Sequence, residues 1–198
     1  MKKFMVSVVA LTALAFNSFA QDTTPNTNYI RPRALGISFV LNDFQTPERI
    51  RTGSLGSVLG NDQWAKVKEM APGIAVSYFK GLKSHVDFAA TVSGSFAKIN
   101  LDDETVSSDQ FFLETDASLN LKMFSDKYFF TPYINVGVGA SIYNGKVGAF
   151  LPLGGGVKLN LFDEAAIFIN SQYRVPVTNT TSAYHFYNSI GIASTIGK

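Results

Sequence analysis

A long alternation of residue types between positions 128 and 143 constrains the fold of this chain more than any other feature. Apolar or aromatic side chains occupy every second position, and from Thr131 to Ser141 the positions between them hold smaller or more polar residues. A repeat of two residues indicates a β-strand, because successive side chains of a strand point to opposite faces. The stretch exceeds both the roughly 5–6 residues of an ordinary strand and the roughly 9–11 tilted residues that cross a bilayer. It is typical of a strand in a transmembrane β-barrel.

Seven further stretches alternate in the same way, so the sequence predicts eight strands in all. We expect them over residues 34–43, 73–80, 85–99, 110–124, 128–143, 146–161, 164–175 and 183–196. Every second connection is a tight turn, and most of the others are longer loops; the exception is the Asn144-Gly145 pair, a strong signal for a type I′ hairpin. This pattern predicts an all-β fold, an eight-stranded antiparallel up-and-down transmembrane barrel with both termini on the periplasmic side.

The first twenty residues have the layout of a secretory signal peptide. Two lysines precede a short apolar core at residues 4–16, and a small-x-small cleavage site ends at Ala20. The alternative is a membrane-spanning helix, but the apolar run is shorter than the roughly 20 residues that such a helix needs. We therefore expect three parts in the chain: a signal peptide over 1–20, a periplasmic leader over 21–32 and a barrel domain over 33–198.

The composition excludes several classes of function. The chain has no cysteine, which excludes disulfides, a thiol nucleophile and cysteine-ligated metals. Its net charge is only +2 and its basic residues are scattered, so the sequence shows no electrostatic footprint for nucleic acid. We expect no nucleic-acid partner, no cofactor and no metal site.

Six charged residues fall on the polar face of the expected strands. They are three acids and three bases, namely Asp87, Glu114, Asp116, Lys122, Lys158 and Arg174. An eight-stranded barrel has an interior that side chains just fill, so balanced charges there predict a salt-bridged plug and not a channel. The alternative is a soluble barrel with these charges in water. The uninterrupted apolar stripes on the other face argue against it, because a sheet facing water would carry charged residues there.

Aromatic residues gather near both ends of the expected strands. We expect two interfacial girdles, one at the short-turn end and one at the loop end. The first would hold Phe79, Phe124, Tyr128, Phe129, Phe130 and Phe162, and the second Phe111, Tyr143, Tyr173, Tyr184, Phe186 and Tyr187.

With these features the chain resembles the small outer-membrane β-barrel domain of the OmpA/OmpX kind. The stretches ALGISFVLNDF, SHVDFAATVSGSF and FDEAAIFINSQYRVPV are similar to barrel domains of Bacteroidota-type outer-membrane proteins. The resemblance covers about residues 30 to 197. It implies an integral protein of the cell envelope of a Gram-negative bacterium, in contact with outer-membrane lipid and lipopolysaccharide and inserted by the barrel-assembly machinery. Many such barrels end in an aromatic residue that this machinery reads, and Lys198 departs from that pattern.

The first external loop, residues 44–71, is where we expect function, because it is too long to be a mere connector. The sequence predicts a short helix over 62–70 with Asp62 as its N-cap, and the start of another over 47–51. Five residues could meet a partner protein or lipopolysaccharide phosphates: Arg49, Arg51, Trp64, Lys66 and Lys68. The alternative is that the loop caps the barrel mouth and Trp64 simply packs there.

An enzyme is a less favoured hypothesis, although some eight-stranded outer-membrane barrels modify lipid A. Such chemistry needs a nucleophile beside a base. Of the two histidines, His85 begins a strand at a turn, and His185 lies roughly 13 Å along its strand from Ser189, too far for proton transfer. The sequence therefore predicts a non-enzymatic outer-membrane barrel with a structural or adhesive role through its external loops. The alternatives are a small pore, a lipid A-modifying enzyme and a soluble ligand-binding barrel.

Overall fold

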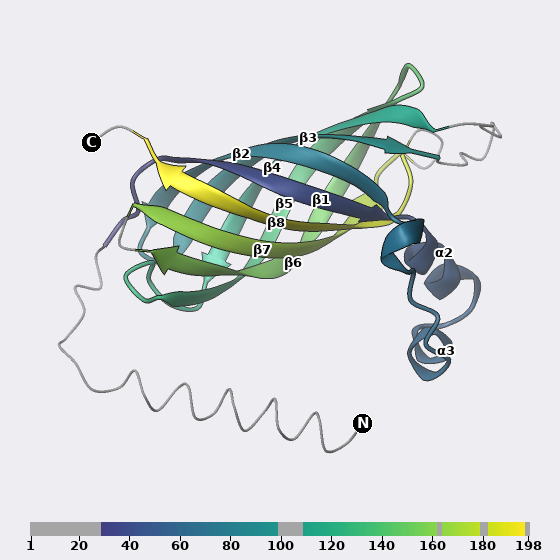
Figure 1. Cartoon of the computed structure of the whole chain (residues 1–198), viewed down its shortest axis with the longest axis horizontal. Coiled ribbons are helices and arrows are strands. Elements are labelled where there is room, and N and C mark those ends of the chain that lie inside the picture. The colour runs from purple at the N-terminus through teal and green to yellow at the C-terminus, as the bar shows by residue number, and fades with distance from the viewer. Residues whose placement is uncertain (1–28, 99–108, 162–163, 179–181, 197–198) are drawn as a thin grey trace.

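The computed structural model describes residues 29–98, 109–161, 164–178 and 182–196 (Figure 1). The expected signal peptide with its cleavage site at Ala20, most of the leader, and Phe162 lie outside these residues. Eight strands follow one another around a closed antiparallel barrel in chain order. Their bounds are β1 Ala34–Asp43, β2 Ala71–Lys83, β3 Val86–Ala97, β4 Gln110–Lys122, β5 Phe130–Tyr143, β6 Lys146–Leu161, β7 Ala165–Pro176 and β8 His185–Thr195.

The sheet closes because β1 pairs with β8 as well as with β2. This last ladder runs from Ala34 opposite Thr195 to Asp43 opposite Phe186. Closure gives every strand a partner on both sides, as a lipid environment requires of backbone N–H and C=O groups. The all-β, eight-stranded antiparallel barrel predicted from the alternation is confirmed.

The two rims of the barrel differ. Figure 1 shows the start of β1 and the end of β8 at one rim, and the helices that follow β1 at the other. We call the first rim the turn end, because β2 passes to β3, β4 to β5 and β6 to β7 there through short connections. We call the second rim the loop end. It carries the segment between β1 and β2, the β5–β6 hairpin and the residues just before β8.

The strands turn apolar side chains outward and polar ones inward. On β5, the outward Val136 and Val138 are 46% and 63% exposed, whereas the inward Tyr133 and Asn135 are buried. Such a wall would be a large apolar patch on a soluble protein, and it is the normal outer face of a barrel in lipid.

The β5–β6 hairpin is the bare turn that the sequence predicts. Tyr143 pairs with Lys146, and the two residues between them have positive φ angles, 48° at Asn144 and 74° at Gly145. A type I′ turn requires positive φ at both central positions, which Asn and Gly adopt at the least cost. The prediction is confirmed. The fifth strand begins at Phe130 and not at Tyr128, because the backbone N–H of Tyr128 donates to the carbonyl of Ser125 in a turn.

Three short helices lie between β1 and β2: α2 Gln45–Thr52, α3 Leu55–Gly60 and the 3-10 helix η1 Val67–Glu69. The helix start predicted over 47–51 is confirmed by α2. The Asp43 carboxylate begins that helix by accepting hydrogen bonds from the backbone N–H groups of Gln45 and Thr46, both at 2.9 Å. In the part of the chain that the structure describes, no helix is long and apolar enough to cross a membrane.

The helix predicted over 62–70 is wrong. Asp62 has a φ of 53°, so it forms a left-handed turn and not an N-cap, and only η1 is helical in this stretch. The backbone N–H of Gln63 donates to the carbonyl of Val58, which ends α3, and that of Ala65 donates to the Thr46 hydroxyl at 2.9 Å. These bonds tie the stretch to α2 and α3 and leave it largely extended.

Candidate functional site

The turn end of the lumen holds a buried group of four charged side chains. Asp87 on β3 pairs with Lys122 on β4 at 2.7 Å and with Lys158 on β6. Lys122 also pairs with Asp126, in the connection after β4, at 2.6 Å. Because β3 and β6 are not neighbours in the barrel, the Asp87–Lys158 pair crosses the lumen.

The loop end of the lumen holds a second buried group, centred on Arg174 of β7. Its guanidinium pairs with two carboxylates on β4, that of Glu114 at 2.6 Å and that of Asp116 at 3.0 Å. It also lies 3.7 Å from the centre of the Tyr187 ring. Arg174 is fully buried, and these pairs again join strands that are not neighbours.

His185 belongs to this second group, which the sequence reasoning missed. Its Nε2 atom lies 3.2 Å from Oε1 of Glu114, and its Nδ1 atom lies 2.9 Å from the carbonyl oxygen of Ala183. β8 and β4 stand on opposite sides of the barrel, so the contact spans the lumen. Alternation places His185 on the polar face, but only the closure of the barrel brings it to Glu114.

Aromatic rings cover this charged group from the loop end. The Phe44 ring, just after β1, lies 4.7 Å from the imidazole of His185 and 5.7 Å from the Phe112 ring, centre to centre. Phe112 in turn contacts Tyr143 at 6.0 Å, and the Tyr143 hydroxyl donates to the carbonyl of Ala97. We call Phe44, Phe112 and Tyr143 the aromatic cover.

Three of the residues expected in the aromatic girdles lie inside the barrel. Phe79, Tyr143 and Tyr187 are 7%, 2% and 2% exposed. Phe79 packs against Phe168 in the lumen, with ring centres 5.3 Å apart. The girdle prediction is wrong for these three, because nearness to a strand end was not enough: each lies at an inward position of its strand. Phe111, Phe129 and Phe130 are exposed.

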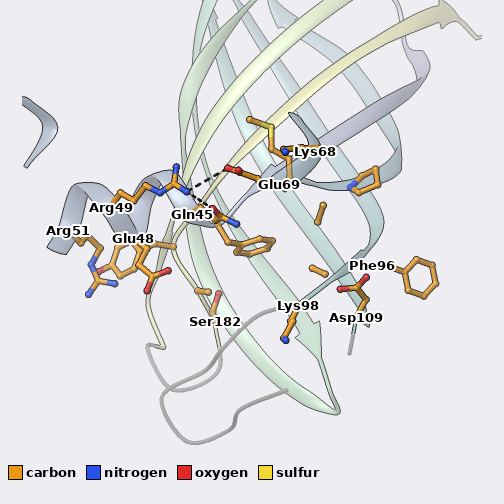
Figure 2. Close-up of a pocket in the computed structure, with 17 residues that line it drawn as sticks. Gln45, Glu48, Arg49, Arg51, Lys68, Glu69, Phe96, Lys98, Asp109 and Ser182 are labelled. Atoms are coloured by element: carbon orange, nitrogen blue, oxygen red, sulfur yellow. Dashed lines mark hydrogen bonds and ion pairs between the residues drawn. The ribbon is translucent and has the colours of Figure 1, made fainter. Parts of the chain in front are cut away.

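A cup of about 810 Å³ opens at the loop end, outside the aromatic cover. Phe44 lines it and also contacts His185, so this ring separates the cup from the charged group below. The other walls come from α2, η1, the loop-end residues of β2 and β3, and the residues just before β8 (Figure 2). The cup therefore has the Phe44 ring on the side of the charged group and a mixed polar rim.

The rim carries charges of both signs. The Arg49 guanidinium donates to the Gln45 side chain at 2.6 Å and lies 3.6 Å from the Glu69 carboxylate, as Figure 2 shows. The backbone N–H of Lys66 donates to the Glu69 carboxylate at 3.1 Å and lowers the pKa of that group, and Arg49 acts in the same direction. Glu69 is thus held ionised. The Arg51 guanidinium lies 4.0 Å from the centre of the Tyr184 ring.

The five residues predicted for partner contact divide into two sets. Arg49, Arg51 and Lys68 line the cup. Trp64 and Lys66 are exposed outside it. The Trp64 ring lies 6.5 Å from Phe186, on the outer wall, so the residue that packs over the mouth is Phe44.

The chemistry of the cup is that of a binding surface. Arg49, Arg51 and Lys68 supply hydrogen-bond donors, and Phe44 and Tyr184 supply apolar surface. Within the ranges that the structure describes, no group of three or more His, Asp or Glu side chains is arranged to hold a metal ion.

No family model and no curated protein matches this chain. Among solved structures, it is similar to Neisserial surface protein A, with a TM-score of 0.55 and 11% identity over 85% of this chain and 99% of that one. It is also similar to Ail, the attachment invasion locus protein of Yersinia pestis, with a TM-score of 0.50 and 11% identity over 83% and 98% of the two chains. The protein therefore has the fold of the small eight-stranded outer-membrane β-barrels.

Proposed function

We propose that this protein is a non-conducting, non-enzymatic barrel of the outer membrane that meets a partner at the cell surface through its loop end. The proposal rests on one observation about the barrel wall. Its outer face is apolar, and ion pairs across the lumen join its inner side chains. The signal peptide ending at Ala20, the Gram-negative host of Bacteroidota type and insertion by the barrel-assembly machinery belong to the same proposal.

The outer wall supports a membrane location. Every strand presents at least one large apolar side chain that is 41% to 70% exposed; examples are Ile37, Ile74, Val92, Leu119, Val138, Leu153, Ile169 and Ile192. An exposed apolar band around a whole barrel is stable in hydrocarbon and unfavourable in water.

The lumen supports a structural and not a transporting role. Two groups of ion pairs cross it, one through Asp87 and Lys158 and one through Arg174 and Glu114. An ion on its way through would have to break these buried pairs, which is costly because each separated charge is left buried without its partner. The aromatic cover adds an apolar barrier at the loop end.

The binding chemistry therefore lies at the loop end, in the cup and the first loop. Arg49, Arg51 and Lys68 offer donors for the carboxylate or phosphate groups of a surface partner, lipopolysaccharide among them, and the acidic Glu48 and Glu69 beside them offer acceptors. The names of the two similar proteins, a surface protein and an attachment protein, support an adhesive role. A non-enzymatic role is supported by His185, which is fully buried and lies under the Phe44 ring, away from the cup.

Labelling on intact cells tests the orientation, because the chain has no cysteine of its own. Lys68→Cys places a thiol at the loop end, and Lys127→Cys places one at the turn end; both lysines are exposed. A membrane-impermeant maleimide should label the Lys68→Cys variant on intact cells and the Lys127→Cys variant only after the outer membrane is opened. The reverse pattern would put the loop end in the periplasm. Discrete conductance steps of the wild-type protein in a planar bilayer would contradict the plug.

A further inference from the structure

The first loop exposes apolar side chains that its own fold does not use. Leu55, Leu59, Trp64 and Val67 are 52%, 56%, 42% and 68% exposed. Leu55 and Leu59 are four residues apart in α3 and so share a face. The same helix buries Val58 completely. α3 is thus anchored on one side and presents leucines on another.

Trp64 continues the outer wall of the barrel. The Trp64 ring lies 6.5 Å from Phe186, and Phe186 lies 5.2 Å from Tyr173, which in turn stacks on Tyr184 at 6.0 Å. Tyr173 and Phe186 occupy outward positions at the loop end of β7 and β8, and Tyr184 directly precedes β8. Tyr and Trp at that height are typical of the boundary between hydrocarbon and headgroups.

Several contacts hold the segment beside this wall. The Ala65 N–H donates to the buried Thr46 hydroxyl, and the Arg49 guanidinium donates to the Gln63 carbonyl, both at 2.9 Å. Arg51 lies over the Tyr184 ring. In Figure 1, α2 adjoins the loop end of the strands and α3 lies off to the side of the barrel axis.

We propose that residues 55–67 form a lipid-interface element. In it Leu55, Leu59, Trp64 and Val67 enter the headgroup region of the outer leaflet, and the exposed Lys66 faces the lipid phosphates. Trp and Leu are the side chains by which amphipathic helices enter the headgroup boundary of a membrane, with basic residues toward the headgroups. A lipid surface is the occupant that fits, because Trp64 adjoins the lipid-facing wall through Phe186 and Tyr173. The inference rests on the proposed outer-membrane location.

The tryptophan fluorescence of the protein reports the position of Trp64, because Trp64 is the only tryptophan of the chain. The processed chain would be folded into vesicles of phosphatidylcholine and phosphatidylglycerol, with or without phosphatidylcholine brominated near the headgroup end of its acyl chains. The fluorescence of Trp64 should be quenched by the brominated lipid and shielded from iodide in the buffer. Quenching by iodide and not by brominated lipid would overturn the proposal. Shielding from both quenchers would also overturn it, in favour of a protein contact.

Paired variants test the apolar anchor. Leu55→Ser combined with Leu59→Ser removes two exposed side chains and should raise iodide quenching of Trp64 and reduce quenching by the brominated lipid. Gly56→Ser combined with Gly60→Ser changes the same helix without removing an apolar group, and it should leave both signals at the wild-type level. A gel-mobility shift of each sample on boiling shows separately that the barrel is inserted. The two failures are therefore distinguishable. A barrel that does not insert counts against the proposed function, whereas an inserted barrel with Trp64 exposed to water counts only against this inference.

Discussion

The Nε2 atom of His185 lies 3.2 Å from Oε1 of Glu114 across the loop end of the lumen, and both side chains are enclosed. The other ring nitrogen of His185 faces the carbonyl of Ala183, which can only accept a hydrogen bond. The Nε2 atom is the ring nitrogen that faces the Glu114 carboxylate. Together with Arg174, His185 gives a partner to a carboxylate that would otherwise be costly to bury.

The first prediction concerns this contact. His185→Phe keeps a ring under Phe44 but leaves Glu114 with one partner fewer, so we expect a loss of about 1–3 kcal/mol in the free energy of unfolding. The measurement is urea unfolding of the barrel in detergent micelles, followed by Trp64 fluorescence. His85→Phe is the matched control, because His85 is exposed at the turn end. Equal stability of the two variants would show that the buried contact contributes nothing.

The second prediction concerns Arg174. Arg174→Met leaves Glu114 and Asp116 buried without their shared cation, and we expect a loss of about 3–5 kcal/mol in the same unfolding measurement. Adding Glu114→Gln and Asp116→Asn to that variant removes the uncompensated charges and should recover a large part of the loss. A triple variant less stable than the single one would contradict the assignment of these residues to one network.

A third prediction concerns the β5–β6 turn. Gly145→Ala forces a Cβ into a backbone with φ of 74°, which we expect to cost about 1–2 kcal/mol. Gly60→Ala is the control, because an added Cβ at Gly60 meets no atom within 4 Å and its φ is not in the left-handed region. Thermal midpoints of the gel-mobility shift compare the two. A Gly145→Ala barrel as stable as the control would mean that the hairpin is not a type I′ turn.

The fourth prediction uses depth in the membrane. Val136 faces outward near the middle of β5, and Val177 is exposed just beyond β7 at the loop end. Arginine at Val136 should destabilise the barrel in vesicles by roughly 2–4 kcal/mol, and arginine at Val177 by roughly 0–1 kcal/mol. Similar effects at both positions would argue that the middle of the wall is not in hydrocarbon.

The two-residue alternation was enough to predict most of the fold. Every strand of a closed barrel separates lipid from lumen, so every strand repeats the same pattern. It placed Asp87, Lys158 and Arg174 inward, and all three are buried there. The alternation could not predict which charged side chains form ion pairs. Asp87 and Lys158 pair because the barrel closes, and not because their strands are in register. His185 is the plainest case: its partner Glu114 stands on the opposite wall.

The conformation of the first loop could not be predicted from the sequence, and the reason is local. The pattern around Asp62 fits a helix start, but Asp also tolerates the left-handed region, and the bond from Gln63 to Val58 selects that turn. Trp64 consequently lies on the outer wall beside Phe186, where no periodicity of the loop would place it.

The measurement that tests the membrane barrel most directly is the gel mobility of the processed protein, boiled and unboiled, after separation of outer-membrane and soluble fractions. A closed membrane barrel resists mild SDS and changes mobility only when it is boiled. We expect the protein in the outer-membrane fraction with a mobility shift on boiling. Recovery in the soluble periplasmic fraction without a shift would contradict a lipid-facing wall and favour a soluble ligand-binding barrel.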